Sequence, residues 1–190
     1  MRKEYITDKT FEKTDFSTNG IAAGDYEGCT FNNCNFSNVD LSGLAFSECA
    51  FTGCDLSLAK LTKTSFRDAR FKECKLLGLR FEHCNNFLFS AGFTGCNLNL
   101  STFFKKNLKK SHFVNCSLQE TDFTESDLSG AVFEQCDLTR AIFYHTILEK
   151  ADFRSSYSYS IDPEMNRMKK ARFSLAGVVG LLDKYDIEVE

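Results

Sequence analysis

A large apolar residue recurs at every fifth position along most of this chain. The column begins at Phe11 and continues without a gap to Phe81, and after one step of seven residues it resumes at Leu88 and runs to Phe153. A period of five matches neither the 3.6 residues per turn of an α-helix nor the two-residue alternation of a strand. The chain must therefore turn once in every repeat. If four repeats close one square coil, side chains twenty residues apart, such as Phe133 and Phe153, should stack inside it.

A second column lies two residues before the apolar one and contains all nine cysteines. They are Cys29, Cys34, Cys49, Cys54, Cys74, Cys84, Cys96, Cys116 and Cys136. A zinc site needs ligands that converge, often from pairs about two to four residues apart, whereas these cysteines would lie singly on the sides of the coil. Their odd number also favours reduced thiols that pack in the wall. The pattern predicts no metal and no cofactor.

The composition favours a cytoplasmic protein that is not an enzyme. Apolar residues make up 43% of the chain, but they never form the run of about 20 that a membrane span needs, and the N-terminus lacks the apolar segment of a signal peptide. The short motifs of phosphate-binding loops, nucleophile elbows and zinc proteases are missing. His83, His112 and His145 fall in outward columns that share no face. We therefore expect neither catalysis nor membrane contact.

The net charge of −3 conceals three blocks of opposite sign. Residues 14–59 and residues 111–139 each contain six acidic residues and no basic ones. Residues 60–110 contain eleven basic and three acidic residues, a net charge of +8. Because the Debye length of about 8 Å is shorter than two coils, each block should produce its own local field. The acidic blocks would then reproduce the field of duplex DNA only in patches.

The basic block ends in a cluster of lysines that could instead bind nucleic acid directly. The cluster consists of Lys105, Lys106, Lys109 and Lys110. No stacking aromatic residues are interleaved with it, and the protein that carries it is acidic overall. We expect no direct nucleic-acid contact.

The step of seven residues near 82–88 should bulge or kink the wall by two residues. Phe87 would then face outward, as Phe104 does in its own outward column. An exposed aromatic residue beside such a discontinuity is either a contact for a partner or a side chain packed under the bulge. Both interpretations of Phe87 and Phe104 stay open.

The five-residue period ends at Ser158, and a different pattern follows. The sequence divides into a repeat region over residues 1–158, with an irregular first coil near 1–28, and a C-terminal module over residues 159–190. Ser174 can cap a helix over about 175–185, and Ile187 and Val189 then alternate with acidic residues as in a short strand. This module either plugs the open end of the rod or also presents an apolar face to a second copy.

Several repeats resemble those of the pentapeptide-repeat family, whose consensus is roughly A(D/N)LXX. They include SDLSG at residues 126–130, CDLTR at 136–140 and ADFRS at 151–155. The resemblance implies an all-β fold, a right-handed quadrilateral parallel β-helix with a short C-terminal helix that caps it or forms a dimer. It covers residues 9 to about 155.

Other segments resemble the branch of this family that contains Qnr, AlbG and McbG, which act in quinolone resistance and in immunity to topoisomerase poisons. They are CDLSL at residues 54–58, TSFRDARFKECKLLG at 64–78 and KARFSL at 170–175. The resemblance implies a cytoplasmic homodimer that acts on DNA gyrase or topoisomerase IV by resembling duplex DNA. The implied topoisomerase contacts are Glu120, Asp122, Glu125, Asp127 and Asp137. The implied dimer contacts are Leu175, Val178, Val179, Leu182, Tyr185 and Ile187. The alternative is a general interaction scaffold with an unrelated protein partner.

Overall fold

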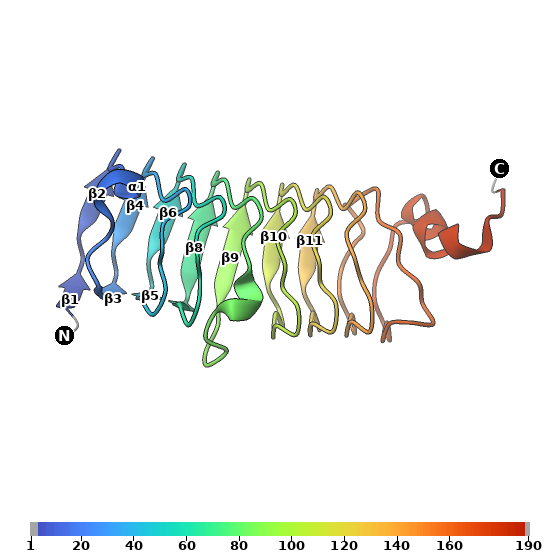
Figure 1. Cartoon of the computed structure of the whole chain (residues 1–190). Coiled ribbons are helices and arrows are strands. Elements are labelled where there is room, and N and C mark those ends of the chain that lie inside the picture. Colours follow the sequence, from blue (N-terminus) through green and yellow to red (C-terminus); the bar gives the residue numbers. More distant parts are fainter. Residues whose placement is uncertain (1–3, 189–190) are drawn as a thin grey trace.

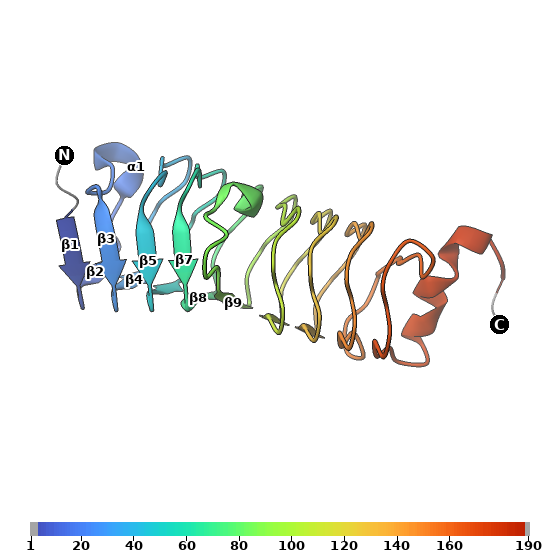
Figure 2. The same ribbon diagram turned by 90° about the horizontal axis from the view of Figure 1, so that it is seen from below.

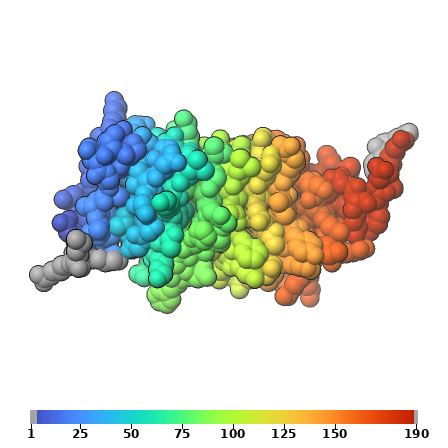
Figure 3. All heavy atoms as spheres, viewed as in Figure 1, coloured from blue at the N-terminus to red at the C-terminus, as the bar shows by residue number. Residues whose placement is uncertain are grey.

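The chain forms a long rod in which successive coils lie side by side (Figure 1, Figure 3). The computed structural model describes residues 4–188. Its strands are β1 (Glu4–Thr7), β2 (Thr10–Glu12), β3 (Gly24–Glu27), β4 (Thr30–Asn32), β5 (Ala45–Ser47), β6 (Ala50–Thr52), β7 (Ser65–Arg67), β8 (Ala69–Lys72), β9 (Ala91–Thr94), β10 (His112–Val114) and β11 (Val132–Glu134). The helical turns within the described residues are α1 (Phe16–Asn19), η1 (Phe81–His83), η2 (Gly177–Leu181) and η3 (Asp183–Tyr185).

All strand pairs are parallel, and they form two of the four faces of the rod. One sheet contains β1, β3, β5 and β7, and the other contains β2, β4, β6, β8, β9, β10 and β11. Partners are twenty residues apart, as in the pair Phe113 and Phe133. The other two faces are ladders of single bridges, which include Ser117 with Asp137 on one face and Asp122 with Ile142 on the other. The predicted all-β quadrilateral parallel β-helix is confirmed.

The hydrophobic core is the lumen of this rod. The Phe133 side chain is 1% exposed, and its ring centroid lies 5.0 Å from that of Phe113 and 4.7 Å from that of Phe153 in nearly parallel stacks. Rings on neighbouring faces meet edge to face, as Phe123 and Phe133 do at 5.9 Å. Both geometries are favourable for aromatic pairs, and each buried ring stabilises the fold by about 1.5–3 kcal/mol. The apolar column is therefore the core that the period predicts.

The nine cysteines lie in the wall as free, buried thiols. Eight of the nine carry the Sγ close to a backbone carbonyl oxygen. In Cys54, for example, the Sγ lies 3.2 Å from the carbonyl oxygen of Phe31 in the preceding coil. Cys136 and Phe113 repeat this contact at 3.3 Å. Across residues 4–188, no group of three or more His, Cys, Asp or Glu side chains is placed to hold a metal ion. The thiols thus serve as small side chains that link adjacent coils.

The two-residue insertion changes the register of pairing once along the rod. Phe71 pairs with Phe93, 22 residues later, whereas the coils before and after it keep an offset of twenty. The inserted segment, in green, projects from the wall next to β9 in Figure 1. Phe87 faces outward, as the sequence predicts, with 65% of its surface exposed.

The prediction that the apolar column resumes at Leu88 is wrong. Leu88 is 62% exposed, and the neighbouring Phe89 packs against the core instead, with its ring centroid 6.2 Å from that of Phe81. The backbone N–H of Ser90 donates to Phe66 O at 3.0 Å. This bond ties the end of the insertion to β7, directly after the residue that turns inward.

Coil pairing continues past residue 158. Asp152 forms a bridge with Arg172, and the ring of Phe173 stacks on that of Phe153 at a centroid distance of 5.3 Å. The first residues of the predicted 159–190 module therefore add to the β-helix. Tyr159 is 4% exposed and also packs on Phe153, so it helps to close the lumen.

The segment predicted as a helix over about 175–185 is helical, but it consists of the two short 3-10 helices η2 and η3 in place of one regular helix. They cross the end of the rod (Figure 2). The predicted cap Ser174 is not the N-cap residue of η2, which is Ala176, but its Oγ accepts a hydrogen bond from the Gly177 N–H at 3.0 Å. A Cβ atom on Gly177 would lie 2.0 Å from the Tyr159 hydroxyl, and one on Gly180 would lie 2.1 Å from the Tyr159 carbonyl oxygen. The two glycines therefore allow close packing on Tyr159, and they also disfavour a regular helix.

The predicted short strand at the C-terminus is not formed at Ile187, and Val189 lies outside the described residues. Among residues 4–188, no helix has the length and apolar character needed to cross a bilayer.

Candidate functional site

The five acidic residues implied as topoisomerase contacts do not lie on one face. Asp137 belongs to the bridge ladder of Ser117, Asp122 to that of Ile142, and Asp127 to that of Ile147. These ladders run along three different faces of the rod. Glu120 and Glu125 occupy left-handed corner positions between faces, with φ values of 55° and 56°. The acidic residues therefore wrap around the rod.

Three of the five carboxylates form ion pairs between coils. Glu125 lies 3.3 Å from Lys105 Nζ, and Asp127 lies 3.2 Å from Lys109 Nζ. Glu120 accepts a hydrogen bond from Arg140. All three pairs are at least partly exposed, so each contributes at most about 1 kcal/mol to stability. They do reduce the local negative field, and the lysines that do so belong to the basic block.

The aspartates of this set also shape the coil. The Asp137 carboxylate accepts hydrogen bonds from the Thr139 N–H at 3.0 Å and from Gln119 Nε2 at 2.7 Å. Partial burial raises the pKa of the Asp137 carboxyl, but the hydrogen bonds from Thr139 and Gln119 outweigh burial, so the pKa lies below its ordinary value. Asp122 accepts from the Thr124 N–H at 2.8 Å. Both aspartates thus stabilise turns, and the lowered pKa of Asp137 keeps its carboxylate ionised at neutral pH.

The two outward aromatic residues each lie under a cation. The guanidinium of Arg67 is 5.6 Å from the ring centroid of Phe87. Phe104 is half-buried, and Lys105 Nζ is 4.7 Å from its ring centroid. Such contacts contribute about 0.5–1 kcal/mol at exposed sites. Phe87 is therefore the more accessible of the two for a partner.

Lys106 is buried, although the sequence places it in a surface cluster with the neighbouring lysines. Its side chain is 1% exposed, and its Nζ donates to the Cys84 carbonyl oxygen at 2.7 Å and to Asn86 Oδ1 at 2.5 Å. Nζ also lies 4.8 Å from the ring centroid of Phe89. Burial lowers the pKa of the Lys106 ammonium, because desolvation disfavours the charged form. Its position two residues before Leu108, in the column that holds the cysteines, was the signal that could have revealed it.

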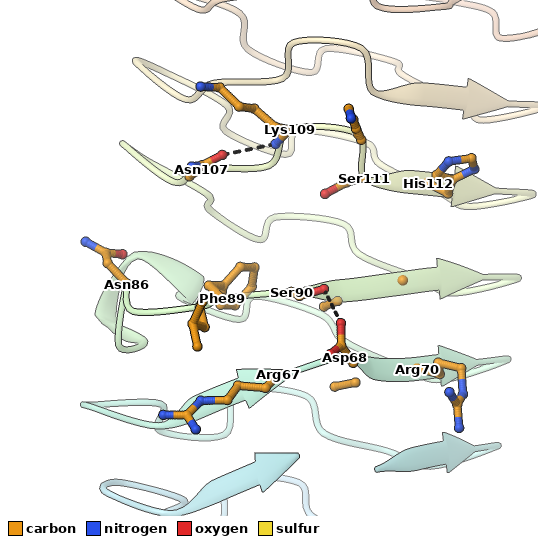
Figure 4. Close-up of a pocket in the computed structure, with 15 residues that line it drawn as sticks. Arg67, Asp68, Arg70, Asn86, Phe89, Ser90, Asn107, Lys109, Ser111 and His112 are labelled. Carbon is orange, nitrogen blue, oxygen red and sulfur yellow. Dashed lines mark hydrogen bonds between the residues drawn. The ribbon is translucent and has the colours of Figure 1, made fainter. Parts of the chain in front are cut away.

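A groove with a volume of about 730 Å³ opens beside the insertion. Figure 4 shows Arg67 and Arg70 on the coil that precedes the insertion, and Lys109 and His112 on the coil that follows it. Phe89 lies between the two coils. We call this cavity the insertion groove, lined by Arg67, Asp68, Ala69, Arg70, Asn86, Leu88, Phe89, Ser90, Ala91, Gly92, Asn107, Lys109, Lys110, Ser111 and His112. The sequence analysis did not identify it, because its walls come from segments about forty residues apart.

The residues implied as dimer contacts lie at the C-terminal end of the rod. Leu175 is 91% exposed, Leu182 is half-buried, and the other four are between 39% and 55% exposed. Those four are Val178, Val179, Tyr185 and Ile187. The structure therefore places an accessible apolar surface at this end.

The chain is similar to known proteins in sequence pattern and in fold. A family model described as a pentapeptide repeat region matches residues 24–86 and 87–158. A trypsin-treated form of QnrB1, a plasmid-mediated fluoroquinolone resistance protein, is 22% identical with a TM-score of 0.50 over 99% of this chain and 98% of that one. HetL, a pentapeptide repeat protein involved in heterocyst differentiation regulation from Nostoc sp. strain PCC 7120, is 21% identical with a TM-score of 0.54 over 90% of this chain and 84% of that one. No curated protein sequence matches significantly.

Proposed function

Because the chain belongs to the pentapeptide-repeat family, we propose that it is a non-enzymatic, cytoplasmic, homodimeric rod that binds a type II topoisomerase. It acts as a partial mimic of duplex DNA on DNA gyrase or topoisomerase IV. In doing so it changes the response of the enzyme to a quinolone or to another topoisomerase poison.

The observation that carries this proposal is the acidic block at residues 111–139. It has six carboxylates and no basic residue of its own, and the structure distributes five of them over three faces of a narrow rod. Duplex DNA also presents negative charge around its whole circumference, about one charge per 1.7 Å of axis. A partner that encloses DNA would meet negative charge here over a short length, although the ion pairs of Glu120, Glu125 and Asp127 reduce its strength. The fold shared with QnrB1 fits this proposal.

The homodimer is supported by the exposed apolar surface at the C-terminal end. Leu175 and Ile187 expose more than half of their surfaces, and Val178 lies between them in the chain. Water contact with such a surface is unfavourable, and a second copy would remove it. Two rods joined at this end would extend the acidic surface in both directions.

The second candidate function is a general interaction scaffold with an unrelated protein partner. The observation that favours it is the equally good fit to HetL, whose described role is in heterocyst differentiation regulation. One fold can serve both roles, because only the outward columns need to differ.

The two candidates are separated by a gyrase supercoiling assay with and without a fluoroquinolone. The test variant replaces Glu120 and Glu125 by Gln, and Asp122, Asp127 and Asp137 by Asn. An Asn side chain keeps the oxygen that accepts the turn hydrogen bonds, so charge is removed and the coil is retained. We expect the variant to lose the effect of the wild-type protein on the inhibited enzyme.

A matched control removes five charges from the other acidic block, with Asn at Asp15, Asp40 and Asp55 and Gln at Glu27 and Glu48. We expect this control to keep most of the effect. Equal losses in both variants would show that total charge, not the block at 111–139, determines binding. If the wild-type protein has no effect on DNA gyrase or on topoisomerase IV, the general interaction scaffold is the function that remains.

The homodimer is tested by measuring the molar mass of two variants with light scattering. Val178→Asp is the test variant, and Leu100→Asp is the control. Both positions are exposed in the structure, but only Val178 belongs to the C-terminal surface. We expect Val178→Asp to halve the mass of the wild-type dimer and Leu100→Asp to leave it unchanged. If the wild-type protein is a monomer at micromolar concentration, the C-terminal segment only covers the open end of the rod and does not form a dimer.

A further inference from the structure

The insertion groove exists because pairing between coils is interrupted on one face of the rod. Asn107 forms a bridge with Asp127 of the following coil. Toward the preceding coil, within the described chain, no backbone hydrogen bond joins residues 85–90 to residues 105–111. Pairing is restored immediately afterwards, where Phe93 meets Phe113 in β9 and β10. The groove is therefore a local gap in a wall that is otherwise continuous.

The gap is held in a fixed shape by the buried Lys106. Its ammonium group donates to Cys84 O and to Asn86 Oδ1, so one side chain replaces backbone bonds that are missing across the gap. On the opposite wall, Asp68 accepts a hydrogen bond from Ser90 Oγ at 3.0 Å. A site that is anchored from both sides loses little conformational entropy when it binds a ligand.

The lining of the groove carries excess positive charge. Across residues 4–188, no carboxylate forms an ion pair with Arg67, Arg70 or Lys110, whereas Lys109 is paired with Asp127. The single carboxylate of the lining is Asp68, which is engaged by Ser90. The Nε of Arg67 is buried and has no hydrogen-bond partner among the described residues. Three cations are thus left for a ligand.

We propose that the insertion groove binds a compact ligand with two or more linked phosphate groups. Guanidinium and ammonium groups are the usual partners of phosphate oxygens, and linked phosphates carry several negative charges in one small ligand, which suits a lining that includes Arg67, Arg70 and Lys110. The volume of about 730 Å³ lies in the usual range of small-molecule sites, about 300–1,000 Å³. This site adjoins the proposed topoisomerase surface through the ion pair of Lys109 with Asp127, but Arg67, Arg70 and Lys110 are not part of that surface.

The ligand is compact because of what surrounds the groove. The acidic blocks at residues 14–59 and 111–139 lie on either side of it along the rod, and they would repel a nucleic acid that extended past the basic block. Next to the charges, Phe89 and Ala91 form an apolar wall, and no atom lies within 4 Å of the position of a Cβ on Gly92. The uncharged part of the ligand would rest there.

The test is isothermal titration of the full-length protein with pyrophosphate. The test variant is the double substitution Arg70→Gln and Lys110→Gln, and the matched control is Lys150→Gln with Lys169→Gln, two exposed lysines of the C-terminal coils. Because a hydrogen bond to a charged group contributes about 1.5–3 kcal/mol, we expect the groove variant to bind roughly tenfold to hundredfold more weakly, and the control to bind like the wild type. Thermal unfolding should show that both variants remain folded.

Three results would overturn the proposal. One is the lack of saturable binding of pyrophosphate by the wild type. Another is an equal loss of affinity in the two double variants, which would mean that the ion is attracted only by net charge. The third is tighter binding of hexaglutamate or of a short DNA duplex than of pyrophosphate, which would assign the groove to an acidic peptide or to nucleic acid. None of these results depends on whether a topoisomerase is bound.

Discussion

The coils from β9 to Phe153 and the insertion at residues 82–90 are built from similar residues but follow different rules. In the regular coils, position in the five-residue period decides whether a side chain is buried, so Phe133 is 1% exposed. In the insertion, Phe87 and Leu88 are more than 60% exposed and Phe89 packs inward, although all three are large and apolar. Stacking on both neighbouring coils fixes the first region, whereas individual hydrogen bonds fix the second. The regular wall therefore supplies stability, and the interruption supplies a specific cavity.

The comparison is tested most strongly by truncating one ring in each region. Phe133→Ala should lower the free energy of unfolding by about 3–5 kcal/mol, because it removes a ring that stacks on two others and leaves a cavity in the lumen. Phe87→Ala should change it by less than about 0.5 kcal/mol, since its ring lies largely in solvent. Urea denaturation measures both. Similar losses in the two variants would contradict the distinction between wall and insertion.

An intermediate effect is expected for the lysine that joins the two regions. Lys106→Ala should lower the free energy of unfolding by about 2 kcal/mol, because Cys84 O and Asn86 Oδ1 would be left without their donor. Lys105→Ala serves as the control, because its side chain is exposed and should cost less than about 0.5 kcal/mol. If chemical denaturation showed equal effects for the two lysines, Lys106 would not be the anchor of the insertion.

The smallest difference between the two regions is expected for the thiols, which should behave alike in both. Burial raises the pKa of Cys49, in the regular wall, to about 12, and it does the same for Cys84 at the insertion. The unfolded thiol ionises near 9.0, so the stabilising contribution is complete below pH 9 and is lost as the pH rises toward 12. Each contribution changes by at most about 1.4 kcal/mol per pH unit.

Cys49→Ala and Cys84→Ala should therefore both weaken the alkaline decline of stability, by similar amounts. Denaturation curves between pH 8 and pH 11 measure this decline. A decline that was reduced in only one variant would show that the insertion changes the environment of the thiol column.

The sequence predicted the wall well because the same requirement, a buried apolar side chain, recurs at every fifth residue. The positions of Phe133 and Cys136 follow from periodicity alone. Leu88 was predicted in the wrong place because the adjacent Phe89 is also apolar, and the hydrogen bonds that hold the end of the insertion at Ser90 are not visible in the sequence. The C-terminal segment was predicted as one helix but forms two short 3-10 helices, because the spacing of its apolar residues does not reveal the close packing of Gly177 and Gly180 on Tyr159. The insertion groove could not be predicted at all, because neither wall carries a local motif.

The offset of 22 residues at the insertion also bears on how the chain finds its order. In a purely periodic chain, a coil could pair with the second coil after it and leave the coil between them as a loop. The phenylalanine rings would still stack in such a state. Such mispaired states compete with the native one during folding. In this chain the insertion makes such mispaired states less stable. A coil that paired in the wrong register across the insertion would bury the Lys106 ammonium without its bond to Cys84 O. The insertion thus helps to fix the pairing register of the regular coils on either side of it.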